Sequence, residues 1–314
     1  MTEISLIEVY KIVDSFFKYF EGNFLVEHFA RNYYGKRGFK RMGMSQKFVT
    51  FSPSPTSFKL SLCTAPIMAL NIYRFFMQFS NLKAFHRFAN KYLKERYPNF
   101  PNYENFLKAT NKSFPMMMLF VNSVLAKNRE KCAGETIHFI DSTPVEVCKN
   151  NKILRHKVAR DCASRGKSTK GWFFGFKLHG VCTADMIVES LTFTTGSVHD
   201  SKMAQKLTKD IIGKAFADAG YQLKSEVLSE MADDGVFMHN APRKNMNRLI
   251  SKEQLDYIKQ RNIIETVWSV MKGRFELVYT KARSLKGMFR HFFYSIAAFL
   301  ISQSACRQKL FIPD

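Results

Sequence analysis

Two short apolar segments of this chain each end in an aspartate, and a charged helical segment with one glutamate follows them. The first segment, residues 136–143, is rich in β-branched and aromatic residues and contains Asp141. The second, residues 214–221, contains Asp218 before a glycine turn. Both patterns predict strands. A carboxylate at the carboxyl end of a buried strand occupies the edge where open α/β sheets place their chemistry. Taken alone, either aspartate could equally be a helix N-cap or a turn residue.

The charged segment runs from Arg261 to Glu265, and Lys272 follows seven residues later. With 3.6 residues per turn, these three side chains lie on one face of a helix, and Tyr257 extends that face. A lone Arg-x3-Glu pair would be read as an exposed ion pair. Beside the two strand-end aspartates, however, the glutamate completes a set of three oxygen donors. Such a set suits Mg²⁺ or Mn²⁺.

The order of the predicted elements indicates the fold class. After residue 131 the pattern predicts three successive strands followed by alternating helices and strands, which implies an α/β fold with a mixed five-stranded sheet flanked by helices. The amino-terminal region is predicted to be all helical. We therefore expect two domains, a helical DNA-binding region over 1–130 and a catalytic domain over 131–314. The remaining expected strands are 171–181, 187–194 and 236–240, and the expected helices are 198–212, 224–232, 253–275 and 285–303.

In this order, the motifs resemble those of bacterial insertion-sequence transposases of the DDE class. The branch that the chain resembles carries a Tyr-x2-Arg-x3-Glu-x6-Lys signature. Arg261, Glu265 and Lys272 fit its last three positions, whereas Tyr257 stands one residue too early for the first. The resemblance covers about residues 131–305. Its other matching pieces are Ile140–Thr143, Gly196–Ser201, Asp218–Tyr221 and Arg165–His179.

The resemblance implies an RNase H-like catalytic domain with two Mg²⁺ ions (Mn²⁺ being the alternative) held by Asp141, Asp218 and Glu265. Asp141 would bridge the two ions, and Arg261 and Lys272 would hold phosphates. The implied reaction is cleavage of the element's ends and transfer of the 3′-OH into target DNA. The implied partners are double-stranded DNA, as terminal inverted repeats and target, and a second copy of the chain in an active homodimer. Two alternatives stay open: an RNase H-like nuclease without strand transfer, and a DNA-binding regulator without catalysis.

The net charge supports a polyanionic partner. The chain carries a formal charge of +22, which favours nucleic acid or an anionic membrane surface. No segment approaches the roughly 20 apolar residues that span a bilayer, and no secretory signal is evident. Six cysteines are scattered without a C-x-x-C pair, as expected of reduced thiols. We therefore expect no membrane association and a location in the bacterial cytoplasm, on the nucleoid when bound.

Basic residues are densest between 149 and 177. A flexible loop at 165–170 is expected to contact the DNA backbone through Arg165, Lys167 and Lys170, the alternative being a solvated surface. Arg243 and Lys244, after the fifth predicted strand, receive the same interpretation.

Several other residues are assigned supporting roles. His199 and Asp200 could support the site from behind, although Asp200 could equally be a helix cap. Further predictions are a basic and aromatic patch at 31–41, a linker at 52–57, and core positions for His138, His179, Trp172 and Phe174.

Overall fold

The computed structural model describes residues 4–19, 64–93, 97, 99–169, 171–240, 250–278 and 280–305. It divides into two compact units, residues 1–121 with 293–314, and residues 122–292. The patch predicted at 31–41 and the linker predicted at 52–57 lie outside the described residues. The predicted domain boundary between residues 130 and 131 stays a prediction.

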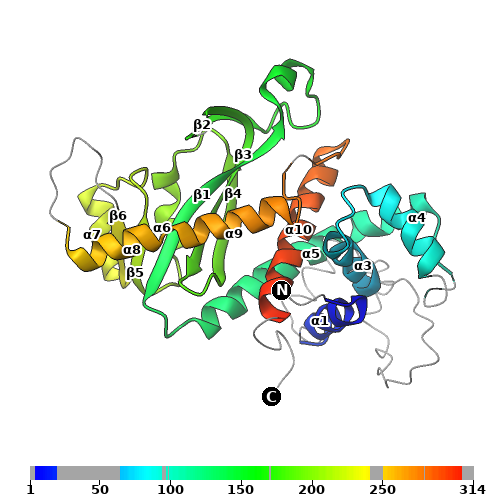
Figure 1. Ribbon diagram of the computed structural model, residues 1–314, viewed down its shortest axis with the longest axis horizontal. Coiled ribbons are helices and arrows are strands. Elements are labelled where there is room, and N and C mark those ends of the chain that lie inside the picture. Colours follow the sequence, from blue (N-terminus) through cyan, green and yellow to red (C-terminus); the bar gives the residue numbers. More distant parts are fainter. Residues whose placement is uncertain are drawn as a thin grey trace, which may run out of the picture. The chain divides into compact units, whose positions relative to one another are not determined.

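The first unit is helical where it is described (Figure 1). Ser5 and Glu8 cap its first helix reciprocally: the Glu8 carboxylate accepts from the Ser5 N–H at 2.7 Å, and the Ser5 hydroxyl accepts from the Glu8 N–H at 3.3 Å. Apolar residues at helical spacing, including Val9, Val13 and Phe16, are buried. The helices that contribute to this unit are α1 (Leu6–Tyr19), α3 (Thr64–Phe76), α4 (Leu82–Tyr92) and parts of α5 (Tyr103–Lys131) and α10 (Leu285–Ala305).

The second unit is built on one mixed sheet with the strand order β2-β3-β1-β5-β6, and β4 also pairs with β3. The long strand β3 is antiparallel to β1, β2 and β4, whereas β5 is parallel to both β1 and β6. This confirms the expected mixed sheet and is consistent with an RNase H-like fold. The strands are β1 (Ile137–Cys148), β2 (Ser164–Ser168), β3 (Gly171–Thr183), β4 (Val188–Thr195), β5 (Gly213–Ala217) and β6 (Val236–Asn240).

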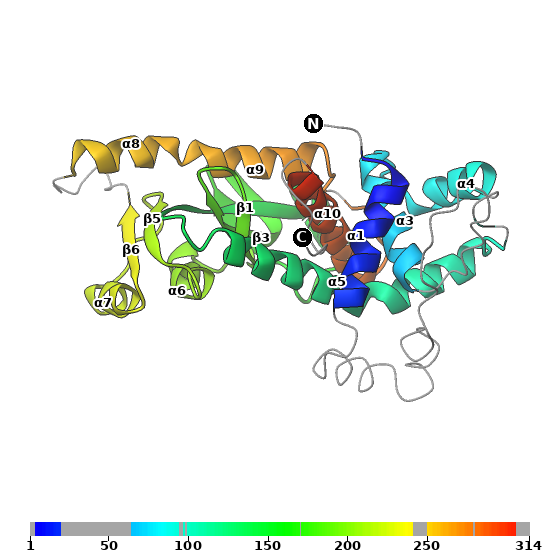
Figure 2. The same cartoon turned by 90° about the horizontal axis from the view of Figure 1, so that it is seen from below.

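Helices cover both faces of this sheet (Figure 2). One face carries α8 (Lys252–Gln260) and α9 (Asn262–Gly273), and the opposite face carries α6 (Ala204–Leu207) and α7 (Ser225–Asp233). Because successive side chains of a strand point to opposite faces, neighbouring residues of β1 enter different cores. Ile140 packs with the α6 and α7 side chains, whereas Phe139 packs against Phe216, the ring that also contacts Tyr257 of α8.

Four details of the predicted elements are wrong. The segment 164–168 is not a flexible loop but strand β2, because its backbone pairs with the start of β3. Only 200–207 of the helix expected at 198–212 is helical, as a 3-10 turn η2 (Asp200–Met203) followed by α6. The helix expected at 253–275 is two helices, α8 and α9, which meet at Arg261. The first strand continues to Cys148. Among the described residues, no helix combines the length and the apolar character needed to cross a lipid bilayer.

A buried ion pair joins β1 to β4 near the start of β1, three residues before Asp141. His138 and Glu189 are 1% and 2% exposed, and the His138 Nδ1 lies 2.8 Å from the Glu189 carboxylate. Its Nε2 lies 3.1 Å from the Ile212 carbonyl oxygen. Only a protonated imidazole can donate to both acceptors. Burial alone would lower the pKa of His138, but the Glu189 hydrogen bond and charge outweigh burial and raise it.

The free energy of unfolding should therefore depend on pH through His138. A folded-state pKa raised above the unfolded value near 6.5 adds stability that is complete below that value and is lost as the pH rises through the folded-state pKa. Urea denaturation between pH 5 and 9 should show a steeper loss of stability with rising pH in the wild type than in His138→Gln. The exposed His199 offers a matched control, since His199→Gln should keep the wild-type slope. Parallel profiles for wild type and His138→Gln would contradict the assignment.

Candidate functional site

Asp141 is the centre of the candidate site. It lies on β1 directly opposite Gly180 of β3, and its side chain is only 15% exposed. Two groups from the α8–α9 region contact its Oδ2 atom: the Trp268 indole N–H donates to it at 3.3 Å, and the Arg261 guanidinium lies 3.5 Å away. Asp141 was predicted to end a strand, but it lies within β1, which continues to Cys148. Its side chain faces the helix predicted to carry the glutamate.

The contact between Trp268 and Asp141 depends on a missing side chain. A Cβ on Gly180 would lie 2.7 Å from the Trp268 ring and 2.9 Å from the Leu191 side chain, closer than real Cβ atoms come. A glycine opposite Asp141 therefore lets the indole lie against β3, where its N–H reaches the carboxylate. Trp268 was not among the predicted site residues, although it lies one helical turn after Glu265 on α9.

The carboxyl group of Asp141 is strongly perturbed. Burial raises its pKa to about 7, and the nearby Asp218 and Glu265 carboxylates add to this rise, while the Arg261 charge and a backbone hydrogen bond oppose it. Asp218 and Glu265 are thus close enough to Asp141 to act electrostatically on its carboxyl group. These two carboxylates and Arg261 come from elements that are far from β1 in sequence.

Asp218 follows β5 and is held by its own turn. Its Oδ1 accepts a 2.8 Å hydrogen bond from the Gly220 backbone N–H, as in a short Asx turn. A Cβ at Gly220 would lie 2.9 Å from that same oxygen, so glycine keeps the turn tight. The Gly-containing turn predicted from the sequence is present, and the other oxygen of Asp218 takes no part in it.

Arg261 connects two of the three carboxylates. It stands at the junction of α8 and α9, and its guanidinium donates to Glu265 Oε1 at 2.8 Å while its other nitrogen faces Asp141. Arg261 is 18% exposed, whereas the Glu265 side chain is 53% exposed. The i,i+4 pairing expected from the sequence is therefore present, but it belongs to a bridge with a buried carboxylate.

The donor set fits a hard divalent cation in chemistry. Asp141, Asp218 and Glu265 offer only carboxylate oxygens, and their mutual repulsion would be relieved by bound positive charge. Among the residues that the structure describes, no three His, Cys, Asp or Glu side chains form a cluster at metal-binding distance. Glu265 is turned towards Arg261.

A second polar cluster lies behind Asp141, on the opposite face of the sheet. Asp200, the first residue of η2, accepts from the Ser142 hydroxyl at 2.9 Å and from the Lys177 ammonium at 3.0 Å. Ser142 is the neighbour of Asp141 on β1. Asp200 is thus more than a helix cap; His199 caps η2 instead, by accepting from the Ser201 N–H. Lys177 was not predicted as a site residue; in the sequence it stood out only as part of the Arg165–His179 segment that resembles the transposase family.

Two buried polar side chains complete this second cluster. His179 is fully buried and its Nε2 meets the Thr194 hydroxyl at 2.7 Å; burial lowers its pKa to about 4 despite the nearby Asp200. Tyr221 is 1% exposed, and its hydroxyl has no hydrogen-bond partner among the described residues. Burial, then Asp141, raises the Tyr221 pKa well above its ordinary value. The Asp-Ala-Gly-Tyr motif was the sequence signal for Tyr221.

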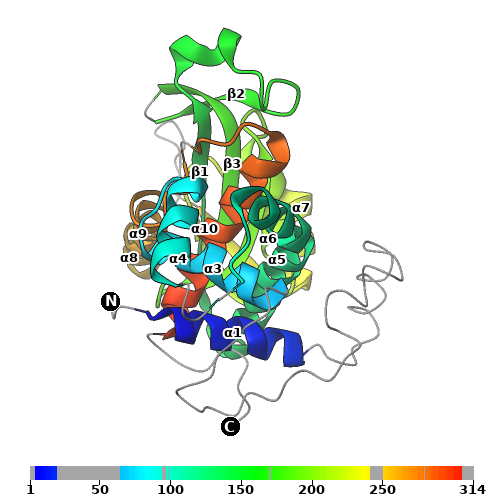
Figure 3. The same ribbon diagram turned by 90° about the vertical axis from the view of Figure 1, so that its right-hand side faces the viewer.

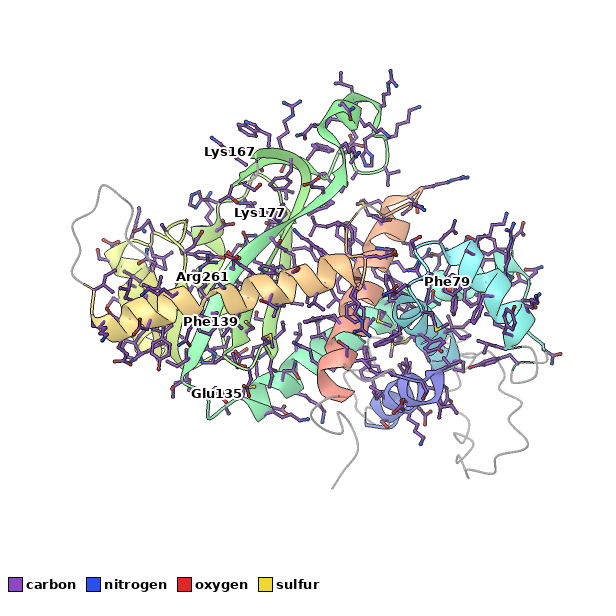
Figure 4. The ribbon with its side chains drawn as sticks, in the orientation of Figure 1. Phe79, Glu135, Phe139, Lys167, Lys177 and Arg261 are labelled. Atoms are coloured by element: carbon purple, nitrogen blue, oxygen red, sulfur yellow. The ribbon has the colours of Figure 1, made fainter. Side chains whose placement is uncertain are left out.

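The other predicted residues lie at different distances from this centre. Tyr257 packs against Phe216 with the two rings tilted by 34° and their centroids 5.0 Å apart. Lys272 lies in the last turn of α9. Arg165 and Lys167 are exposed on β2, and Figure 4 shows Lys167 well separated from Arg261. The other predicted DNA contacts, Lys170, Arg243 and Lys244, lie outside the described residues.

Fold and site together define an α/β domain of the RNase H-like type with an acidic centre where the sheet meets α9. Residues 131–285 match the family model described as the transposase DDE domain. This segment contains Asp141, Asp218 and Glu265 and all six strands of the sheet. No curated protein and no solved structure matches the chain.

The packing of Trp268 over Gly180 can be tested by a double-mutant cycle. Gly180→Ala should lower the free energy of unfolding by about 1–3 kcal/mol, because the added methyl group overlaps the indole. In a Trp268→Phe background the shorter ring leaves room, so the same change should cost less, with a coupling energy of at least ~0.5 kcal/mol.

Urea denaturation of the four proteins gives this coupling. Gly134→Ala is the matched control, because a Cβ there meets nothing within 4 Å and should be neutral in both backgrounds. Strict additivity of Gly180→Ala and Trp268→Phe would show that the ring does not depend on the glycine.

Proposed function

We propose that this protein is a DNA transposase of an insertion sequence, which cleaves the ends of its element and joins the freed 3′-OH to target DNA. The observation that supports this most is the arrangement around Asp141. Within the segment that matches the transposase DDE domain, one buried carboxylate has two further carboxylates as electrostatic neighbours and an arginine bridge to one of them.

The proposed chemistry needs no nucleophile from the protein. When bound, two Mg²⁺ ions would activate a water or a DNA 3′-hydroxyl and stabilise the leaving oxygen of an in-line displacement at phosphorus. Asp141, Asp218 and Glu265 would hold these ions. The Trp268 N–H keeps one oxygen of Asp141 in place. The guanidinium of Arg261 is planar and permanently charged, so it is suited to bidentate binding of a phosphate once Glu265 turns away from it.

The substrate proposed is double-stranded DNA, as terminal inverted repeats and as target. A formal charge of +22 supports a polyanionic partner, and Arg165 and Lys167 place exposed positive charge on the sheet that carries Asp141. We further propose that two copies of the chain act together on the two ends of the element. The four described cysteines are free thiols, in keeping with the proposed bacterial cytoplasm.

A supercoiled plasmid with candidate terminal repeats, taken from the DNA that flanks the reading frame, tests this proposal. A transposase should release the segment between the repeats and join it to a second DNA molecule in the presence of Mg²⁺. Nicking without joining would identify a nuclease instead. Binding without any cleavage would identify a regulator.

Removing charge from any of the three carboxylates should abolish cleavage. Asp141→Asn, Asp218→Asn and Glu265→Gln keep the side-chain shape but remove charge that would neutralise bound cations, so binding of DNA should stay largely intact while strand cleavage is lost. Glu226→Gln, at an exposed carboxylate of α7, is the control and should cleave normally. Wild-type cleavage by any one of the three variants would show that its carboxylate is not part of the site.

Arg261→Ala should impair cleavage far more than folding. The pair with the exposed Glu265 contributes only about 0.3–0.5 kcal/mol to stability, and the buried Asp141 can take up a proton when Arg261 is removed. A preorganised donor to transition-state charge is worth a factor of ~10²–10³ in rate. Tyr257→Phe keeps the ring that packs against Phe216 and should change neither quantity by much. Melting temperature and cleavage rate should be compared for both variants. An Arg261→Ala protein that cleaves at the wild-type rate would limit this arginine to holding Glu265.

A further inference from the structure

The two tryptophans of the chain have opposite environments. Trp268 is 4% exposed beneath the site, whereas Trp172, near the start of β3, is 62% exposed. The sequence predicted a core position for Trp172 because it alternates with Phe174, which is indeed 8% exposed. That prediction is wrong for Trp172: the outer end of β3 pairs with β2, but none of the described helices covers this ring. A large apolar side chain is therefore presented to the surroundings on a paired strand.

The backbone around Trp172 is firmly held although its ring is exposed. Trp172 is paired directly with Lys167 of β2, and its carbonyl oxygen accepts a 2.6 Å hydrogen bond from the Asn150 side chain. The Lys167 ammonium lies 6.0 Å from the centre of the indole ring, within reach of a cation–π contact. The ring thus has a fixed base and a positive charge beside it.

Positive charge also surrounds this end of the sheet. The segment 149–163 connects β1 to β2 and projects with the outer end of the sheet (Figure 3). It has one acidic residue, Asp161, and its Leu154 side chain is 92% exposed. The exposed basic residues of this segment are Lys149, Lys152, Arg155, Lys157 and Arg160. The exposed Arg165 and Lys167 of β2 lie next to them in the sequence.

An exposed indole among basic side chains suits a ligand that offers an apolar face as well as phosphate groups. Lysine and arginine alone suffice to bind the backbone of a duplex, whereas an exposed indole gains energy only from a partner with an apolar face. In nucleic acid that face belongs to a base, and stacking on an aromatic side chain requires a base that has left the duplex stack. The charge complementarity favours DNA over an apolar protein partner.

We propose that Trp172 is a stacking site for an unpaired nucleobase, with Lys167 and Arg165 binding the adjoining phosphates. This rests on the proposed function in so far as the ligand is DNA. Trp172 lies eight residues along β3 from Gly180, the partner of Asp141, which is about 26 Å at roughly 3.3 Å per residue.

The experiment compares two duplexes of identical length, one fully paired and one with a three-nucleotide unpaired bubble. Both are titrated with the full-length protein in EDTA, so that no cleavage intervenes. The wild type should bind the bubble duplex more tightly, by roughly 5- to 150-fold for one stacked base. Trp172→Ala should lose this preference while it still binds the paired duplex, and Lys167→Ala should weaken binding to both duplexes and flatten their salt dependence.

Phe237→Ala is the matched control, because Phe237 of β6 is 54% exposed elsewhere on the same sheet; it should keep the preference. Tryptophan fluorescence gives a second measurement. Bubble DNA should quench the emission of the wild type, and Trp172→Phe, which leaves only the buried Trp268, should show little quenching.

Three results would overturn the stacking site. The first is equal binding of both duplexes by the wild type, and the second is an unchanged bubble preference in Trp172→Ala. The third is a Trp172→Ala protein whose sole defect is lost self-association, measured by light scattering. That result would make this surface a protein interface. Failure of the proposed function is distinguishable from these results, since a protein that prefers the bubble but never cleaves would retain the stacking site without being a transposase.

Discussion

The bridge that Arg261 forms between Asp141 and Glu265 is the interaction on which the candidate site depends. A carboxyl group as buried as Asp141, with two other carboxylates nearby, would stay protonated without a compensating charge, and Arg261 is the cation that lowers its pKa. With all groups ionised, three carboxylates face one guanidinium. The remaining negative charge is what a divalent cation would neutralise, and cation binding would free Arg261 from Glu265 to meet a phosphate.

This bridge requires α9 to lie close against β1 and β3. Gly180 makes that approach possible, because any side chain there would meet the Trp268 ring. Trp268 then fixes the distance between helix and strand through its indole N–H bond to Asp141. A single residue without a side chain, opposite the central carboxylate, thus sets the position of the helix that carries Glu265. Packing and electrostatics at the site cannot be varied independently.

Features that arise from local pattern were predictable from the sequence. Apolar runs predicted β1 and β5, and the i,i+4 spacing predicted the pairing of Arg261 with Glu265. Properties that depend on distant parts of the chain were not predictable in this way. The burial of Trp172 depends on whether a helix covers that end of the sheet, and none of those described does. Periodicity likewise continues across Arg261, although one helix ends and the next begins there.

The role of β1 shows why such tertiary effects matter for function. Asp141 and Ser142 are adjacent, so the pleat directs one towards α9 and the other towards Asp200 on the opposite face. The Asp200 carboxylate, held in turn by Lys177, therefore anchors the backbone of the central aspartate from behind. Partly buried charges of this kind are costly when one partner is missing. The position of Asp141 is thereby set by two polar networks on two faces, neither of which is visible in the spacing of the three carboxylates.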